Sequence, residues 1–404
     1  MNILFLADMF PYPPQSGGRL RTYNLLKQIS SNNIDFICKS EETITNDKIN
    51  HLKKYARSVN CIIDKKKSSV NRIFNLLKNK SDKVYLSFSE EYQEKVDDFL
   101  ENNEYDAIFV DSFYVYQYIY NNDKVNRCKS KIIIDLHNVE HEIIYRMMKK
   151  STSLFIKIYG FKEYRNIIKL EKKYVKDVDL ILNVSQRDKD QYIKLYNIDS
   201  KKMIVINNGV DINIANNYKL KSQLKEEQYV LFIGSLWYRP NRDGITWFIK
   251  KIWPIINKEL PELKLKIIGK NLDNQEEEKY DNVEYLGFID DIYEYYSKCS
   301  CFIVPIQYGS GTRLKILEAM SFKCPIVSTT IGAEGLEIEN MKNIIISDDE
   351  ELFAKNVINI VEDKKMSDKL SINGYKLVEE KYTWDKIGEK LRVSIESLIR
   401  SKNE

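Results

Sequence analysis

Short apolar runs rich in β-branched residues alternate with helical stretches along almost the whole chain of 404 residues. Strands that alternate with helices indicate parallel sheets, because a parallel strand pair needs a crossover and a helix usually provides it. The strands expected in the first half are Asn2–Asp8, Ile34–Lys39, Cys61–Asp64, Ala107–Asp111, Ile132–Leu136, Leu180–Val184 and Ile204–Ile206. Those expected in the second half are Tyr229–Gly234, Leu263–Ile268, Val283–Leu286, Phe302–Pro305 and Ile326–Thr329.

A polar stretch from Ile212 to Gln228 separates the two series of strands. It has no strong period and therefore predicts a connection between domains. We expect an N-terminal domain over 1–210, a linker over 211–228, a C-terminal domain over 229–384, and a final helix over 385–404 that can pack back on the N-terminal domain. Both domains are predicted to be doubly wound α/β folds that face each other across a cleft. Such folds bind ligands where the strands end and the following loops begin.

Composition excludes several classes of protein. The net charge of +4, from 63 basic and 59 acidic residues, is too small for a chain-wide nucleic-acid binder. Apolar runs are too short to span a bilayer, and the start of the chain lacks the basic region of a secretory signal. The six cysteines have neither zinc-site nor disulfide-scaffold spacing, which predicts reduced cysteines and a cytoplasmic protein.

A glycine pair follows the first strand, in the sequence PYPPQSGGRLR that begins at Pro11. Gly17 and Gly18 allow the backbone to approach a ligand closely, and the helix expected near Leu20 offers free N–H groups to an anion. A proline-rich turn without function explains these residues equally well. The spacing is not the G-x-G-x-x-G pattern of dinucleotide-binding proteins.

A second glycine-containing loop, YGSGTRLKILEAM, begins at Tyr308 after the strand that ends at Pro305. Its glycines precede a helix, and Arg313 and Lys315 add cations that suit a phosphate. Glu318 lies among apolar neighbours, where a carboxylate is costly unless it is paired or bonded to a ligand such as a ribose diol. The alternative is an ordinary helix with basic residues on its surface.

The sequence DLHNVEHE, which begins at Asp135, contains the H-x-x-E-H pattern of inverted zinc peptidases. A zinc site needs both histidines on one helix face, with a further ligand. His137 directly follows an expected strand, so we expect it on a loop, in contact with a polar ligand rather than a metal. A purely structural histidine remains the alternative. The acidic pair Asp290 and Asp291 also precedes a helix, where N-capping explains it better than metal binding.

Residues 143–176 hold ten Lys and Arg against two Glu, interleaved with large apolar residues. Basic amphipathic helices of this kind can lie on anionic lipid surfaces. A solvated basic helix is the alternative, and a nucleic-acid-binding motif is missing. The segment predicts peripheral contact with the inner face of the cell membrane.

Together these motifs resemble the family-4 retaining glycosyltransferases (glycosyl transferases group 1), which have the GT-B architecture of two Rossmann-like domains. The likeness covers essentially the whole chain. It includes VINNGVD near the linker, FIGSLWYRPNRDGITWFI and GTRLKILEAM, of which the last is highly specific.

The resemblance implies a metal-independent enzyme of hexosyltransferase type, without a cofactor, whose donor substrate is a nucleoside diphosphate sugar. It implies a carbohydrate or lipid-linked hydroxyl acceptor and a role in cell-surface polysaccharide or glycolipid synthesis. The residues expected to act in catalysis are His137, Arg313 and Lys315. Those expected to bind the donor are Gly17, Gly18, Arg239, Ser310, Gly311, Thr312, Leu314 and Glu318.

Individual roles follow from matching positions. His137 corresponds to a family histidine beside the transferred sugar, and Glu318 to the second Glu of the E-x7-E motif, which would bind the ribose. The first Glu of that motif falls on Ser310. Position 235, where the family has an arginine, is Ser235, so we expect Arg239, together with Arg313 and Lys315, to supply the positive charge.

Three alternatives remain beside the transferase. An epimerase or hydrolase of nucleotide sugars would share the fold, and Ser310 makes a catalytically silent nucleotide-sugar binder conceivable. A zinc peptidase is the most distant.

Overall fold

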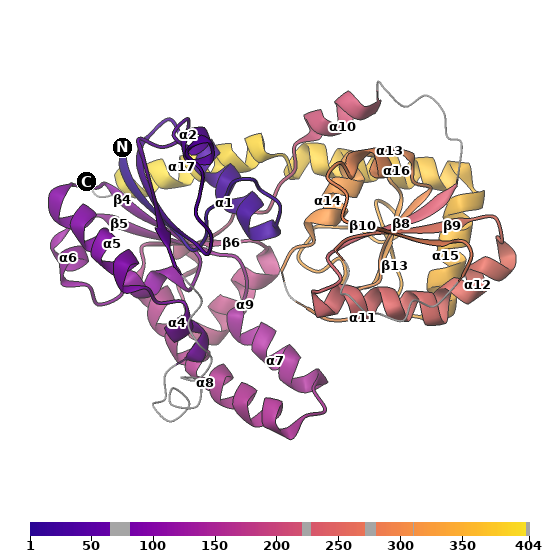
Figure 1. Ribbon diagram of the computed structural model, residues 1–404, viewed down its shortest axis with the longest axis horizontal. Coiled ribbons are helices and arrows are strands. Elements are labelled where there is room, and N and C mark those ends of the chain that lie inside the picture. The colour runs from indigo at the N-terminus through magenta and orange to yellow at the C-terminus, as the bar shows by residue number, and fades with distance from the viewer. Residues whose placement is uncertain (65–80, 220–227, 271–279, 310, 401–404) are drawn as a thin grey trace. The chain divides into compact units, whose positions relative to one another are not determined.

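The computed structural model describes residues 1–64, 81–219, 228–270, 280–309 and 311–400 (Figure 1). The chain divides into two compact units. The first consists of Met1–Asn207 together with Asp385–Glu404, and the second of Asn208–Trp384.

Within the described residues, seven parallel strands form the sheet of the first unit, in the order β3-β2-β1-β4-β5-β6-β7. The inner strand β1 pairs on both sides, so that Ile3 lies opposite Ile34 of β2 and Ala107 of β4. The strands are β1 (Asn2–Ala7), β2 (Asn33–Ser40), β3 (Ser58–Ile63), β4 (Ala107–Asp111), β5 (Lys131–Leu136), β6 (Leu180–Asn183) and β7 (Met203–Val205). The helices are α1 (Gly17–Gln28), α2 (Asn46–Leu52), α4 (Asp82–Leu86), α5 (Glu90–Asn102), α6 (Asp123–Arg127), α7 (Glu140–Lys150), α8 (Leu154–Asp177), α9 (Gln186–Tyr196) and α17 (Trp384–Arg400).

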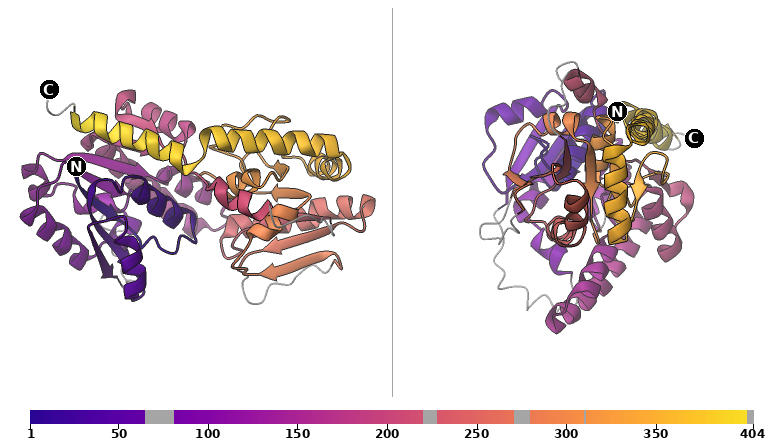
Figure 2. Two further views of the ribbon diagram at one scale, coloured as in Figure 1. Left: turned by 90° about the horizontal axis from the view of Figure 1, so that it is seen from above. Right: turned by 90° about the vertical axis from the view of Figure 1, so that its right-hand side faces the viewer.

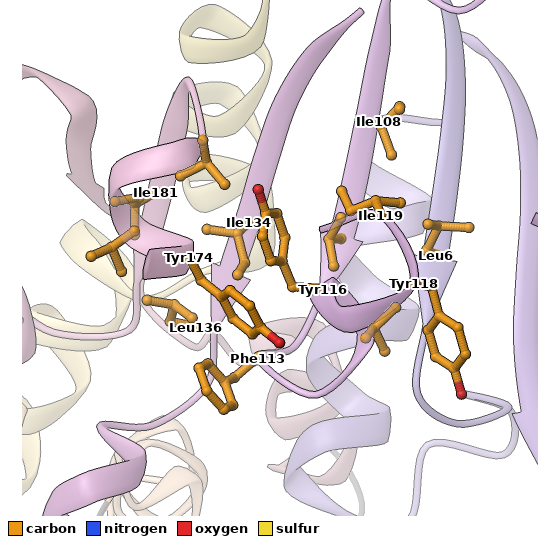
Figure 3. Close-up of a cluster of buried hydrophobic side chains, with 14 of the residues drawn as sticks. Leu6, Ile108, Phe113, Tyr116, Tyr118, Ile119, Ile134, Leu136, Tyr174 and Ile181 are labelled. Carbon is orange, nitrogen blue, oxygen red and sulfur yellow. The ribbon is translucent and has the colours of Figure 1, made fainter. Parts of the chain in front are cut away.

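Buried side chains on one face of this sheet pack against helix α8 and the short 3₁₀ turn Val115–Tyr118 (Figure 3). Ile134 of β5 lies beside the rings of Tyr116 and Tyr174, whose centroids are 4.6 Å apart. Because helices cover both faces of a parallel sheet, its strands read as nearly continuous apolar runs. This is the pattern that made the strands recognisable in the sequence.

The sheet of the second unit has the order β10-β9-β8-β11-β12-β13, again with parallel pairs, over the residues that the structure describes. Its strands are β8 (Tyr229–Ile233), β9 (Lys264–Ile268), β10 (Val283–Gly287), β11 (Cys301–Val304), β12 (Ile326–Ser328) and β13 (Ile345–Ile346). Its helices are α10 (Ile212–Lys219), α11 (Arg239–Trp247), α12 (Trp253–Glu259), α13 (Tyr293–Lys298), α14 (Leu314–Ser321), α15 (Glu350–Glu362) and α16 (Lys364–Lys381).

The stretch expected as a linker over 211–228 is in part a folded element of the second unit. Helix α10 buries Ala215 completely, and Ile212 and Ile214 pack against the core of this unit. Asparagines interrupt this short apolar face, so the sequence pattern did not predict the helix. Residues 220–227 lie outside the described residues.

Helix α17 belongs to the first unit, although it follows the second in the sequence (Figure 2). Arg392 Nη1 donates hydrogen bonds to the backbone oxygen and to Oε1 of Gln28, at 2.9 and 2.8 Å, at the end of α1. Across the described ranges, no helix combines the length and the apolar character needed to cross a membrane.

The stacked phenylalanines of β1 and β4 allow the packing of the first unit's sheet to be tested. Phe109 is fully buried and stacks on Phe5 with ring centroids 4.5 Å apart. We expect Phe109→Ala to lower the free energy of unfolding by about 3–5 kcal/mol, because it removes a buried ring and leaves a cavity. Urea unfolding followed by circular dichroism measures the change.

The matched control is Phe288→Ala, since Phe288 is 64% exposed. We expect this variant to stay within about 0.5 kcal/mol of the wild type. Equal effects of the two substitutions would contradict the packing described for the first sheet.

Candidate active site

His137 lies in the loop between β5 and α7, at the carboxyl end of the first sheet. Its Nε2 is 2.7 Å from Asp111 Oδ1 and 3.2 Å from Asp135 Oδ2. Asp111 and Asp135 are register partners at the ends of the neighbouring strands β4 and β5, and both are buried. The parallel pairing of these strands thus brings two carboxylates to one side of the imidazole.

The two carboxylates are held by further buried groups. Arg21 donates to both oxygens of Asp135, from Nε at 2.7 Å and from Nη2 at 2.6 Å. The Thr22 hydroxyl donates to Asp111 Oδ2 at 2.6 Å. Such bidentate and charge-assisted bonds fix the orientation of buried carboxylates, and they keep both aspartates directed at His137.

The electrostatics of this cluster favour a charged imidazole. Burial of His137 lowers its pKa, but the Asp111 and Asp135 carboxylates outweigh that effect and raise the pKa of His137 to about 10. Burial likewise opposes the charge on Asp135, yet Arg21 and His137 hold the pKa of its carboxyl at about 2. His137 is therefore an imidazolium at neutral pH.

The remaining ring nitrogen of His137 faces the glycine pair. A Cβ on residue 18 would lie 3.9 Å from His137 Nδ1, so Gly18 and the imidazole border the same space. Helix α1 begins at Gly17, earlier than the expected position near Leu20, and its N-cap residue Ser16 makes no side-chain capping bond. The N–H groups of the first turn therefore lack a side-chain cap at the helix end that borders this space.

Asp111, Asp135 and His137 are the described residues whose ligand atoms lie close enough together to be tested as a metal site, within 4.8 Å of one another. Their hydrogen bonds do not suit a cation, since Arg21 already occupies both oxygens of Asp135. A metal ion would have to displace this buried guanidinium. His141 is turned elsewhere, with Nδ1 2.6 Å from Glu171 Oε2, so the H-x-x-E-H pattern does not form one ligand set.

A polar cavity of about 480 Å³ opens at the carboxyl ends of β1 and β2 in the first unit. Asp8, Tyr12, Arg19 and Lys39 are among its lining residues. A larger cavity, of about 880 Å³, lies at the opposite edge of the same sheet, where Asn2 begins β1. We assign ligand binding to the smaller cavity, because parallel sheets bind ligands at the carboxyl ends of their strands.

In the second unit, the loop between β11 and α14 carries the expected donor-binding residues. Gly309 and Gly311 have φ angles of +133° and +83°, which residues with a side chain rarely adopt. Ser310 between them lies outside the described residues. The Arg313 guanidinium folds back against the loop, because a Cβ on residue 309 would lie 2.5 Å from its Nη2.

Helix α14 begins directly after this loop, and its N-cap residue Arg313 makes no side-chain capping bond. The Ile316 N–H already donates to the Arg313 carbonyl oxygen at 2.9 Å, so the amides left for a ligand are those nearer the start of the helix, including that of Leu314. The buried Thr312 hydroxyl has no hydrogen-bond partner among the described residues. A buried hydroxyl without a partner is costly, and it indicates a ligand or water position here.

Lys315 reaches the end of β8. Its Nζ donates to Asn241 Oδ1 at 3.1 Å and lies 4.9 Å from the centre of the Phe232 ring. Burial, together with the nearby Arg313 charge, lowers the pKa of Lys315 to about 7, against the opposing effect of Glu318. The amine is thus poised to gain a proton when an anion binds beside it.

Glu318 lies one turn further along α14, on the same side as Lys315. Its Oε2 accepts a hydrogen bond from the Tyr296 hydroxyl at 3.1 Å. Burial raises the pKa of Glu318, while Tyr296 and Lys315 act in the opposite direction. A carboxylate in this setting suits an additional hydroxyl donor.

Arg239 opens helix α11, but its side chain is 68% exposed and its Nε is 3.3 Å from Asp243 Oδ2. Asp243 also accepts a hydrogen bond from the Tyr308 hydroxyl, which ties α11 to the glycine-containing loop. Asn241, Asp243 and Tyr296 were not predicted from the sequence, because only the strand order brings them near the loop that begins at Tyr308.

Ser112 was also missed. It follows Asp111 with a φ of +108°, a strained conformation for a residue with a side chain, and strain of this kind gathers at functional sites. Asp111 could have been predicted from strand pairing. It ends β4, which pairs with β5, and His137 directly follows β5, so the two side chains must lie close together.

Two sequence families match the chain, one in each half. The family described as Glycosyltransferase Family 4 matches residues 70–214, and the family described as Glycosyl transferases group 1 matches residues 227–363. The chain belongs to the family-4 glycosyltransferases. The resemblance stated from the motifs is thereby confirmed, and the protein is a glycosyltransferase.

This glycosyltransferase is 26% identical over 399 residues to an uncharacterized 44.6 kDa protein in the cps region of Klebsiella pneumoniae, over 96% of this chain and 97% of that protein. It is 26% identical over 204 residues to the O-antigen chain mannosyltransferase RfbU of Salmonella typhimurium, over 49% of this chain and 54% of that protein. Anabaena Alr3699/HepE, solved with UDP and glucose, matches with a TM-score of 0.66 and 14% identity, over 98% of this chain and 100% of that chain. The predicted fold class, two Rossmann-like α/β domains of GT-B type, is confirmed.

The charged state of His137 can be measured by NMR titration of the imidazole resonances. We expect a pKa of about 10, which Asp111→Asn lowers towards the ordinary value of about 6.5 because one carboxylate is lost. Since the folded pKa lies above the unfolded one, the stabilisation from this group is complete below about pH 6.5. It is lost as the pH rises to about 10.

Asp98→Asn is the control for this titration, because Asp98 is a half-exposed carboxylate on α5 of the same unit. It should leave the His137 resonances unchanged. A wild-type pKa near 6.5 would contradict the charged cluster.

Proposed function

We propose that this glycosyltransferase transfers a hexose from a nucleoside diphosphate sugar to a hydroxyl of a carbohydrate or lipid-linked acceptor. The observation that carries the proposal is the helix α14 start, where the uncapped helix end, Lys315 and Glu318 follow the Gly309–Gly311 loop. Amides and an amine suit the diphosphate, and a carboxylate one turn further suits the ribose hydroxyls.

The leaving group determines what the donor site must do. As the acceptor oxygen bonds to C1 of the sugar, the bond from C1 to the diphosphate oxygen breaks, and negative charge collects on the phosphates. The amides of the α14 start and the Lys315 amine are fixed donors that can stabilise this charge without a metal ion. UDP and glucose in the structure of Alr3699/HepE support a nucleotide-sugar donor for this chain as well.

The resemblance implies retention of configuration at the transferred sugar. The hydrogen bonds of the two carboxylates near His137 bear on how retention is achieved. Asp135 is bound by Arg21 and Asp111 by Thr22, so neither is available to form a covalent sugar intermediate. We therefore favour attack on the face that the diphosphate leaves. The leaving phosphate oxygen then takes the proton of the acceptor hydroxyl.

The first unit supplies His137 and the acceptor site in this proposal. The imidazolium Nδ1–H, which borders the same space as Gly18, would donate to a hydroxyl or phosphate oxygen of a bound substrate. The cavity near Asp8 and Lys39 offers both donors and acceptors, as a carbohydrate requires. The O-antigen chain mannosyltransferase among the relatives supports a role in cell-surface polysaccharide synthesis.

Turnover with a panel of nucleoside diphosphate sugars tests the proposal. We expect release of the nucleoside diphosphate to require added acceptor and to persist in EDTA. Glu318→Ala should raise the donor KM about 10- to 100-fold, because a hydrogen bond to a charged group contributes roughly 1.5–3 kcal/mol. Glu379→Ala, at an exposed carboxylate on α16, should leave the donor KM unchanged.

Two results would contradict the proposal. Release that does not depend on acceptor would indicate a hydrolase or an epimerase, and donor binding without any turnover would indicate a silent binder. Loss of turnover in EDTA would overturn the metal-independent mechanism alone.

A further inference from the structure

Large apolar side chains are exposed at the tip of the hairpin formed by helices α7 and α8. Leu154 and Phe155 are both 71% exposed, Ile158 is 65% exposed and Phe161 is 55% exposed. Figure 1 shows α7 and the first half of α8 projecting from the sheet of the first unit. Exposed apolar residues that gather in one place mark an interaction surface, whereas scattered ones need no explanation.

These residues begin a continuous stripe along α8. Leu154, Ile158 and Phe161 follow the i, i+4, i+7 spacing of one helix face. The same face continues, at the same spacing, with exposed basic residues, which are Arg165, Lys169, Lys172 and Lys176. We call these seven residues the α8 stripe; it is apolar at the tip of the hairpin and basic along the rest of the helix.

The two acidic residues of the segment 143–176 do not reach this surface. Glu163 is buried and accepts hydrogen bonds from Ser81 Oγ and from the backbone N–H groups of Asp82 and Lys83. Glu171 is buried and bonded to His141. The charges that this segment exposes are therefore cations alone, which the sequence count of ten basic and two acidic residues could not show.

An apolar tip beside an all-cationic face is complementary to a surface that is apolar inside and anionic outside. We infer that the α8 stripe docks on an anionic lipid bilayer, with the apolar tip below the headgroups and the basic residues at the level of the lipid phosphates. A second copy of the chain fits less well, because pairing two such hairpins would bring like charges together. The inference concerns a surface apart from the donor-binding residues, and its test does not depend on the reaction proposed above.

Flotation with lipid vesicles tests the inference on the full chain. We expect binding to vesicles of phosphatidylcholine with 30% phosphatidylglycerol, and at least about tenfold weaker binding to phosphatidylcholine alone, because each cation near an anionic surface adds to the attraction. The triple variant Leu154→Ser, Ile158→Ser and Phe161→Ser, which removes the apolar part of the α8 stripe, should bind anionic vesicles at least about tenfold more weakly.

A matched control removes exposed apolar side chains elsewhere on the same unit. Leu195 on α9 and Val393 on α17 are 47% and 61% exposed. The double variant Leu195→Ser and Val393→Ser should float like the wild type. Equal flotation of the triple variant and this control would overturn the inference, provided that circular dichroism shows both to be folded.

The basic part of the stripe has its own variant. Arg165→Glu, Lys169→Glu and Lys172→Glu together should lower binding to anionic vesicles at least about tenfold and remove most of its salt dependence. The same reversal at the exposed Lys364, Lys365 and Lys369 of α16 is the control for net charge, and it should have a much smaller effect.

Analytical ultracentrifugation of the protein without lipid tests whether a second copy of the chain, rather than a bilayer, covers the α8 stripe. We expect the wild type and the triple serine variant to have the same mass in solution. A dimer that the serine substitutions abolish, together with the absence of flotation, would show that a second copy covers the stripe and would overturn the inference.

Discussion

Parallel strand pairing is the constraint on which the rest of this structure depends. Because all paired strands in each sheet run in one direction, their carboxyl ends meet at one edge, and the loops that follow them become neighbours. In the first unit this brings the start of α1 together with His137 and Asp111. In the second it brings Lys315 from α14 to the end of β8.

Buried charges give these edges their chemistry. Arg21, Asp135, His137 and Asp111 form a chain of alternating charges, and each neighbour offsets the cost of burying the next. Lys315 lacks a comparable carboxylate at ion-pair distance among the described residues, and its pKa is lowered accordingly. One edge thus holds a stable cation, whereas the other holds an amine whose charge a bound anion would restore.

Sequence patterns predicted the strands and the glycine-containing loops, because apolar runs and glycines depend on local chemistry. They did not predict the contacts between residues that only the strand order brings together. Asp111 is 26 residues from His137, and Tyr296 is 22 residues from Glu318, so only the sheets bring these pairs together. The helix over Ile212–Lys219 was missed because asparagines interrupt its apolar face. Composition could not predict that α8 exposes only basic charges between residues 154 and 176, because the burial of Glu163 and Glu171 depends on the fold.

The central claim is that the diphosphate of the donor binds beside Lys315. Calorimetric titration with UDP and GDP at pH 8, in buffers of different ionisation enthalpy, tests it most directly. Since the pKa of free Lys315 is about 7, a bound diphosphate should raise it and cause uptake of about one proton per site, and Lys315→Met should abolish that uptake. Binding without proton uptake, or the same uptake in Lys315→Met, would contradict the account.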